Sequence, residues 1–106
     1  MIPTVTAALE AGGPTDVPVD SPLTESALGA TRTGELAFSV LSRRPVASVL
    51  VSDAELLAAR DRLWEEFRLA VEPAAAVPFA AWLAGRVPGE RPCVVLCGAN
   101  TDWTPV

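Results

Sequence analysis

Apolar residues in this chain fall into short continuous runs and into stripes at helical spacing. Two runs, residues 46–51 and 92–97, lack the regular alternation of a half-exposed strand. Such runs are typical of strands that are buried on both faces of a parallel sheet. Helical patterns separate the two runs, so the sequence predicts an α/β fold whose parallel strands are joined by a right-handed crossover.

Two helices are expected in the first half of the chain. Residues 4–11 form one, which the Gly-Gly-Pro sequence at 12–14 ends. The other begins near Thr31 or Thr33, either of which is a suitable cap, and it stops before Pro45. The predicted buried side of this second helix consists of Leu36, Phe38, Val40 and Leu41.

Two further helices are expected in the second half. Ser52 and Glu55 have the spacing of a capping box, so one helix begins there. Its predicted apolar stripe consists of Leu56, Leu57, Leu63, Trp64, Phe67 and Val71. Pro73, with Glu72 just before it, suits the first turn of the next helix, in which Pro78 should cause a kink or a break.

Length and charge limit what the chain can be. With 106 residues it is at most one domain, a single segment 1–106 with an extended loop at 12–26 and a tail at 101–106. The net charge of −5 argues against nucleic acid or an anionic membrane as a partner. No basic leader and no apolar run of membrane-spanning length is present, so a soluble, cytoplasmic protein is expected.

Three missing residue types exclude several kinds of site. All 8 basic residues are Arg, and the chain has no Lys, no His and no Tyr. A Schiff-base lysine, a histidine general base, a Ser-His pair and a His-bearing zinc site are therefore impossible within this chain. No metal site is expected.

The two cysteines lie four residues apart on one predicted strand. Their Cα atoms would be about 13 Å apart at the rise of an extended chain, too far for a disulfide. Cys93 is interpreted as a small buried hydrophobe. Cys97 is either a residue of the same kind or a polar atom that faces a ligand at the carboxyl end of its strand. The small-residue turn that follows it, beginning at Gly98, favours the ligand-facing interpretation.

Four short segments occur together in a specific order and spacing. They are Ala27-Leu28-Gly29, the Val49–Glu55 strand-to-helix step, the Glu72–Ala76 helix start and the Val94–Asp102 stretch. Together they resemble the C-terminal part of the serine/threonine dehydratases, which are pyridoxal-phosphate enzymes of fold type II. The resemblance implies a partial three-layer α/β domain with a parallel sheet, part of the large domain of those enzymes.

The resemblance also implies which residues face the cofactor. Cys97 matches the position that hydrogen-bonds the pyridine nitrogen of pyridoxal 5′-phosphate, and Gly98 follows it. Gly29 matches a loop whose backbone lines the cofactor, and Glu72 matches a glutamate near the site. The residues alone slightly favour another interpretation of Glu72, as a charge at a helix N-terminus, and leave open that Gly29 is only a turn glycine. Ala99 departs from the family, which usually has a second Gly there.

The lysine, the phosphate loop and the substrate-carboxylate loop of the family lie upstream of the matched region. The first hypothesis is therefore a C-terminal fragment of a serine/threonine dehydratase that is not catalytic alone and has no catalytic residue of its own. Its expected partner is the missing N-terminal half or another copy of the protein, and a small amino acid is the substrate of the complete enzyme. The alternative is a non-catalytic α/β binding or interaction module. A thiol-dependent enzyme using Cys97 is the least favoured hypothesis, since no Lys or His activates the thiol.

Overall fold

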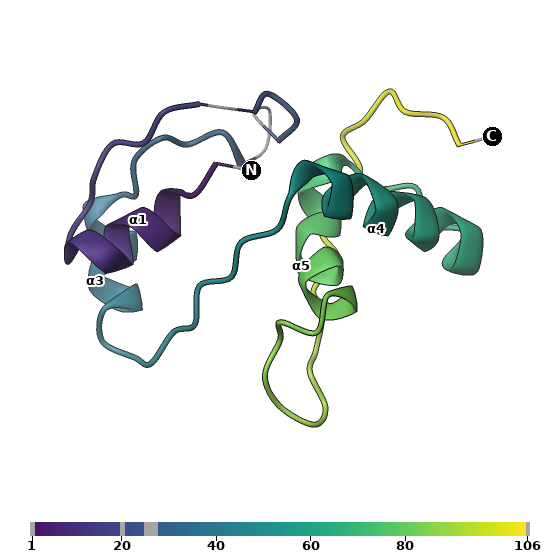
Figure 1. Cartoon of the computed structure of the whole chain (residues 1–106). Helices are drawn as coiled ribbons and strands as arrows, with labels where there is room; N and C mark the ends of the chain where they lie inside the picture. Colours follow the sequence, from purple (N-terminus) through teal and green to yellow (C-terminus); the bar gives the residue numbers. More distant parts are fainter. Residues whose placement is uncertain (1, 20, 25–27, 106) are drawn as a thin grey trace. The chain divides into compact units, whose positions relative to one another are not determined.

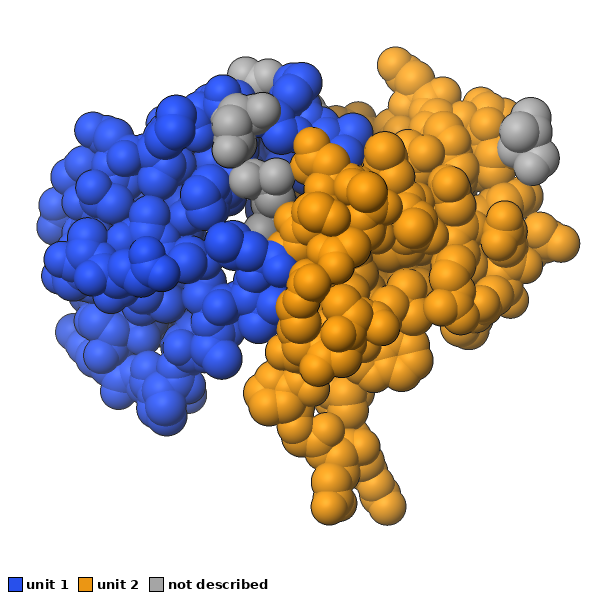
Figure 2. Space-filling model, viewed as in Figure 1, with its two compact units in different colours: residues 1–50 blue, residues 51–106 orange. Residues whose placement is uncertain are grey.

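The computed structural model describes residues 2–19, 21–24 and 28–105. The chain divides into two compact units, Met1–Leu50 and Val51–Val106, which are described separately below (Figure 2). The first unit contains helices α1 (Thr4–Ala11) and α3 (Glu35–Leu41). The second contains α4 (Asp53–Phe67) and α5 (Pro73–Leu83), followed by a loop and an extended C-terminal segment (Figure 1).

The two predicted strands do not form a sheet. Within the described residues no strand is assigned, and both 46–51 and 92–97 run outside regular secondary structure. The expectation that these runs are buried on both faces is also wrong for this chain by itself, because Leu50 is 44% and Val95 63% exposed. A strand is paired and covered by its neighbours, and the described part of the chain places no strand beside either run.

Helix α1 agrees with its prediction. Its C-cap is Gly12, whose backbone has a left-handed φ of 75° and whose N–H donates to the carbonyl of Ala8. Glycine adopts this conformation without a steric penalty, which explains why the helix ends there. Residues 12–19 and 21–24 of the expected loop contain neither helix nor strand, whereas Asp20 and residues 25–27, including the Ala27 of the first family segment, lie outside the described residues.

Helix α3 is present, but its cap and its buried side were predicted wrongly. Its N-cap is Gly34, and no side chain caps it. The hydroxyl of Thr33 instead donates to the carbonyl of Thr4 at 3.5 Å. No residue of α3 is buried, and Leu36 and Val40 are 80% and 53% exposed. An apolar stripe becomes buried only where another element covers it, and the described residues of this unit do not cover α3.

Helix α4 begins at the predicted capping box. Ser52 Oγ accepts from the backbone N–H of Glu55 at 3.2 Å, and Glu55 Oε2 accepts from the N–H of Ser52 at 2.8 Å. The predicted stripe is correct only in part. Leu56 and Leu63 are buried, but Phe67 is 57% exposed and the helix ends there. Val71, although buried, lies beyond the helix.

Helix α5 packs on α4 and forms the core of the second unit. It begins at Pro73, as predicted. Its buried residues are Ala75, Ala76, Phe79, Ala80 and Ala81. Four of these five are alanines, so the two helix backbones can approach closely. Pro78 lies inside α5 without dividing it, which shows that the missing N–H of one proline is tolerated in this packed helix.

Candidate functional site

Glu72 and Gly98 meet at the N-terminus of α5. The backbone N–H of Glu72, the N-cap residue, donates to the carbonyl of Gly98 at 3.3 Å. The Glu72 side chain lies against Gly98, and its Cδ atom is only 2.8 Å from where a Cβ at position 98 would stand. Gly98 also has a φ of 119°, which favours glycine. The sequence predicted both as site residues, and the fold brings them together.

Glu72 is a largely buried residue, with 8% of its surface exposed. It does not cap α5, since the helix has no side-chain cap bond. Among the described residues no hydrogen bond or ion pair satisfies its oxygens. In the part of the chain that the structure describes, the buried side-chain atoms that lack a hydrogen-bond partner are Thr24 Oγ1 and Arg60 Nε. The Glu72 oxygens are not among them, so they keep contact with solvent and are available to a hydrogen-bond donor of a ligand.

Cys97 directly precedes Gly98, so it lies at the same turn. Its thiol is free and exposed, which is consistent with a ligand-facing position. Cys93 is also free and exposed, so its interpretation as a buried hydrophobe is wrong in this chain. The reason is again the missing neighbour, because the odd-numbered side of the 93–97 segment is left open.

Gly29, the fourth predicted site residue, belongs to the first unit. It is half-buried and lies in the loop before α3. Ala30, the residue after Gly29, accepts a hydrogen bond at its carbonyl from the hydroxyl of Thr4 at the start of α1. Val17 donates from its backbone to the carbonyl of Thr31 at 2.9 Å. These bonds hold the Gly29 loop within its own unit, whereas Glu72, Cys97 and Gly98 belong to the other.

Sequence reasoning missed a contact of the C-terminal segment. The guanidinium carbon of Arg60, on α4, lies 4.2 Å from the ring centroid of Trp103. The expected tail therefore has an anchor, although residues 101–105 contain neither helix nor strand. Although Arg60 is charged, its side chain on α4 is only 17% exposed. Sequence spacing gives no signal for a pairing of residues so far apart.

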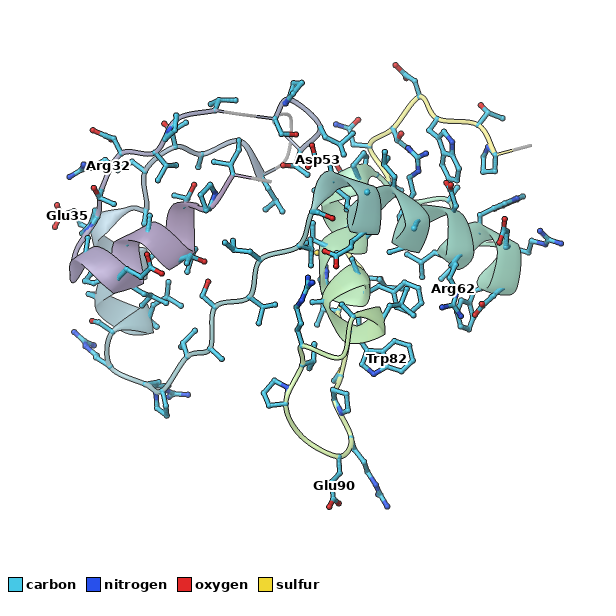
Figure 3. The ribbon with its side chains drawn as sticks, viewed as in Figure 1. Arg32, Glu35, Asp53, Arg62, Trp82 and Glu90 are labelled. Carbon is cyan, nitrogen blue, oxygen red and sulfur yellow. The ribbon has the colours of Figure 1, made fainter. Side chains whose placement is uncertain are left out.

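An apolar groove of about 450 Å³ opens on the second unit. Its lining consists of Leu63, Phe67, Leu69, Phe79, Trp82, Glu90, Pro92, Val94 and Leu96. Two ring contacts build one wall, Phe67 against Phe79 edge to face at 6.4 Å and Phe79 stacked on Trp82 at 5.6 Å. Figure 3 shows Trp82 on α5 and Glu90 in the loop that follows it. The even-numbered residues of the 92–96 segment thus face the groove, and the odd-numbered ones face away.

A bidentate ion pair joins the start of α4 to the loop after α5. Arg86 donates from both terminal nitrogens to Glu55, at 2.9 and 2.7 Å. These bonds from Arg86, together with the bond from the Ser52 N–H, lower the pKa of Glu55 from 4.5 to about 2. This ion pair is structural rather than catalytic, because both carboxylate oxygens of Glu55 already accept hydrogen bonds from Ser52 or Arg86.

Neither a metal site nor a membrane span was found in residues 2–19, 21–24 and 28–105. No three potential ligands from His, Cys, Asp and Glu gather there. No helix in that part of the chain has the length and apolarity to cross a membrane.

Comparison with known proteins identifies the family. A family model described as pyridoxal-phosphate dependent enzyme matches residues 1–98, which is most of the chain. The chain belongs to this family. It is 37% identical over 98 residues to a phenylserine dehydratase from Ralstonia pickettii, covering 90% of this chain and 30% of that protein. Its fold is similar to the crystal structure of the T.th. threonine deaminase, with a TM-score of 0.81 and 27% identity, over 98% of this chain and 35% of that one.

These matches support the resemblance found from the sequence, a serine/threonine dehydratase-like member of fold type II. The chain spans about a third of the length of the relatives it matches. Pyridoxal phosphate is the cofactor expected for this family.

The residues at the Cys97 turn fit the ring of that cofactor. Cys97 is exposed, Gly98 adds no side chain, and no described residue hydrogen-bonds the Glu72 carboxylate, which lies against Gly98. The chain does not supply the covalent attachment, since it contains no lysine. The fit therefore concerns the ring alone.

Proposed function

We propose that this chain is the cofactor-ring segment of a pyridoxal-phosphate-dependent dehydratase that releases ammonia from a small hydroxy amino acid such as serine or threonine. The observation that carries the proposal is the contact between Glu72 and Gly98. It joins two segments of the family pattern, 26 residues apart in the chain, at the turn that holds Cys97. By itself the chain is not catalytic, because the lysine of the reaction must come from other polypeptide.

Each site residue has a distinct task in this proposal. When bound, pyridoxal 5′-phosphate supplies the electron sink that stabilises negative charge on the amino acid. Cys97 binds the ring nitrogen through its thiol, and a neutral thiol does not hold that nitrogen protonated. Glu72 keeps the Cys97–Gly98 turn in place and offers its carboxylate to a donor at the ring. Gly29 keeps the task that the family resemblance implies, a loop whose backbone lines the cofactor.

The proposal includes a parallel sheet that this chain does not complete. In the complete enzyme residues 46–51 and 92–97, which lie outside regular secondary structure in this chain, become strands beside neighbours from further polypeptide, either more of the same protein or another copy. The exposed apolar residues of both runs and the open groove support this interpretation. A self-contained binding module would cover such a surface, because exposed apolar area of this kind promotes association.

Complementation in trans tests the proposal. The chain is mixed with the phenylserine dehydratase of Ralstonia pickettii from which the matched 98-residue segment has been deleted. Formation of 2-oxo acid from serine, threonine or phenylserine is measured with pyridoxal phosphate present. We expect product only in the mixture. A stable complex of the two parts that forms no product would contradict the proposal.

Variants of the two cysteines sharpen this test. Cys97→Ser retains a neutral donor at the ring and should keep most of the activity, whereas Cys97→Asp adds a negative charge and should lower it at least about tenfold. Cys93→Ser is the matched control and should leave the activity unchanged. The chain alone, given pyridoxal phosphate, should show neither product nor the absorbance of covalently attached cofactor.

A further inference from the structure

Arg60 and Trp103 join the C-terminal segment to α4. The guanidinium carbon lies 4.2 Å from the Trp103 ring centroid, within the range of a cation–π interaction. Arg60 Nη2 also donates to Asp61 at 3.3 Å, which helps to fix the guanidinium. Arg60 Nε is buried and has no hydrogen-bond partner in the described part of the chain. The aromatic face and the Asp61 carboxylate are therefore the two partners of a charged side chain that is 17% exposed.

Local hydrogen bonds stiffen the chain between Gly98 and Trp103. The N–H of Thr101 donates to the carbonyl of Ala99 at 2.9 Å. The N–H of Trp103 donates to the hydroxyl of Thr101 at 3.0 Å. At the other end of this span, the Gly98 carbonyl accepts from Glu72. Residues 98–103 are thus held at both ends, by α5 at the start and by α4 at the finish.

We propose that Arg60 is a positioning residue for the Cys97 turn and that it acts through Trp103. The inference rests on the proposed function for its biological meaning, because the turn matters only if Cys97 binds the ring. Its physical content does not depend on the cofactor. The contact between Arg60 and Trp103 holds residues 98–103 against α4 and α5, and this keeps Cys97 in one orientation. Without it, only the contact with Glu72 remains.

Alkylation of the two thiols by iodoacetamide measures this directly in the cofactor-free chain. Mass spectrometry follows Cys97 as the reporter and Cys93 as the internal control, since both are exposed and lie on the same segment. Arg60→Gln and Trp103→Leu remove the stack. Arg60→Lys retains the positive charge. Arg62→Gln is the matched control, because Arg62 is on the same helix but pairs with Glu66.

We expect the alkylation rate of Cys97 to rise about threefold in Arg60→Gln and Trp103→Leu, a factor near the lower end of what the loss of a cation–π contact allows. In Arg60→Lys and Arg62→Gln it should stay near that of the natural chain, and Cys93 should react at one rate throughout. A Cys97 rate unchanged by both stack-removing variants would overturn the proposal. So would an equal rise at Cys93, which would indicate general loosening of the unit. Failure of the complementation assay leaves this result unaffected, so the two proposals are tested separately.

Discussion

The carboxylate of Glu72 occupies the space that a side chain at position 98 would need. Its Cδ atom lies 2.8 Å from the ideal Cβ position of Gly98, and the Glu72 N–H binds the Gly98 carbonyl at 3.3 Å. The start of α5 and the turn after Cys97 are therefore shaped to each other. Neither can change without affecting the other.

Gly98→Ala should destabilise the second unit by about 2 kcal/mol, because the strain of a positive φ of 119° adds to the cost of moving the Glu72 side chain out of the space of the new methyl group. Gly89→Ala is the matched control. Gly89 has a φ of 99°, but nothing lies within 4 Å of its ideal Cβ, so it should lose only about 1 kcal/mol. Urea denaturation followed by circular dichroism gives both values. Equal losses would show that Glu72 does not restrict position 98.

The ion pair of Glu55 and Arg86 should make stability depend on pH. The pKa of Glu55 falls to about 2 in the folded chain, below its ordinary value of 4.5, chiefly through the hydrogen bonds from Arg86. A carboxylate whose pKa is lowered by folding stabilises the folded state above pH 4.5, and that contribution is lost as the pH falls towards 2.

Comparison with Glu55→Gln measures this contribution. The difference in free energy of unfolding between the natural chain and this variant should be constant from neutral pH to about pH 5. It should then shrink as the pH falls and be nearly gone at about pH 2. Glu65→Gln is the control, because it removes a carboxylate from the same helix and leaves the Glu55–Arg86 ion pair intact. Its effect on the free energy of unfolding should not disappear between about pH 5 and about pH 2 in the way expected for Glu55→Gln. A difference that is independent of pH would contradict the role of the ion pair.

The capping box at Ser52 should contribute measurably to stability. Ser52→Ala removes the acceptor of the Glu55 N–H and should cost about 1 kcal/mol. Ser52→Thr retains a hydroxyl and should cost a smaller amount. Chemical denaturation compares the two variants, and an equal loss in both would mean that the hydroxyl does not cap α4.

Leu63 should be a main contributor to the core of the second unit. It is 1% exposed between α4 and α5, so Leu63→Ala should cost about 3 kcal/mol. Val95→Ala removes apolar atoms from a side chain that is 63% exposed and should change stability by less than about 0.5 kcal/mol. A large loss for Val95→Ala would indicate that the 93–97 segment is already covered, for example by self-association.

Local signals in the sequence predicted the helices well. The Ser52–Glu55 spacing and Pro73 each set a helix start through interactions with nearby residues, which a sequence displays directly. The predicted strands and the buried side of α3 depend on distant partners instead. Leu36 and Val95 have the pattern of core residues, yet they stay exposed because the described residues include nothing that covers them.

The candidate site shows the same division. Glu72, Cys97 and Gly98 were predicted as site residues because they belong to a family pattern, and the structure adds that Glu72 and Gly98 are in contact. The pairing of Arg60 with Trp103 was missed, since neither residue belongs to that pattern and no spacing rule joins a helix to a distant tail. Such contacts are decided by the path of the chain in three dimensions.

The placement of the tryptophans allows the unfolding of the second unit to be followed apart from that of the whole chain. All three tryptophans, Trp64, Trp82 and Trp103, belong to the second unit, and the chain has no tyrosine. Tryptophan fluorescence therefore reports on the unit that contains the Cys97 turn, and α1 and α3 contribute no signal to it. Far-ultraviolet circular dichroism records the helices of both units. Melting curves from the two signals would coincide if the units unfold together and separate if each unfolds alone.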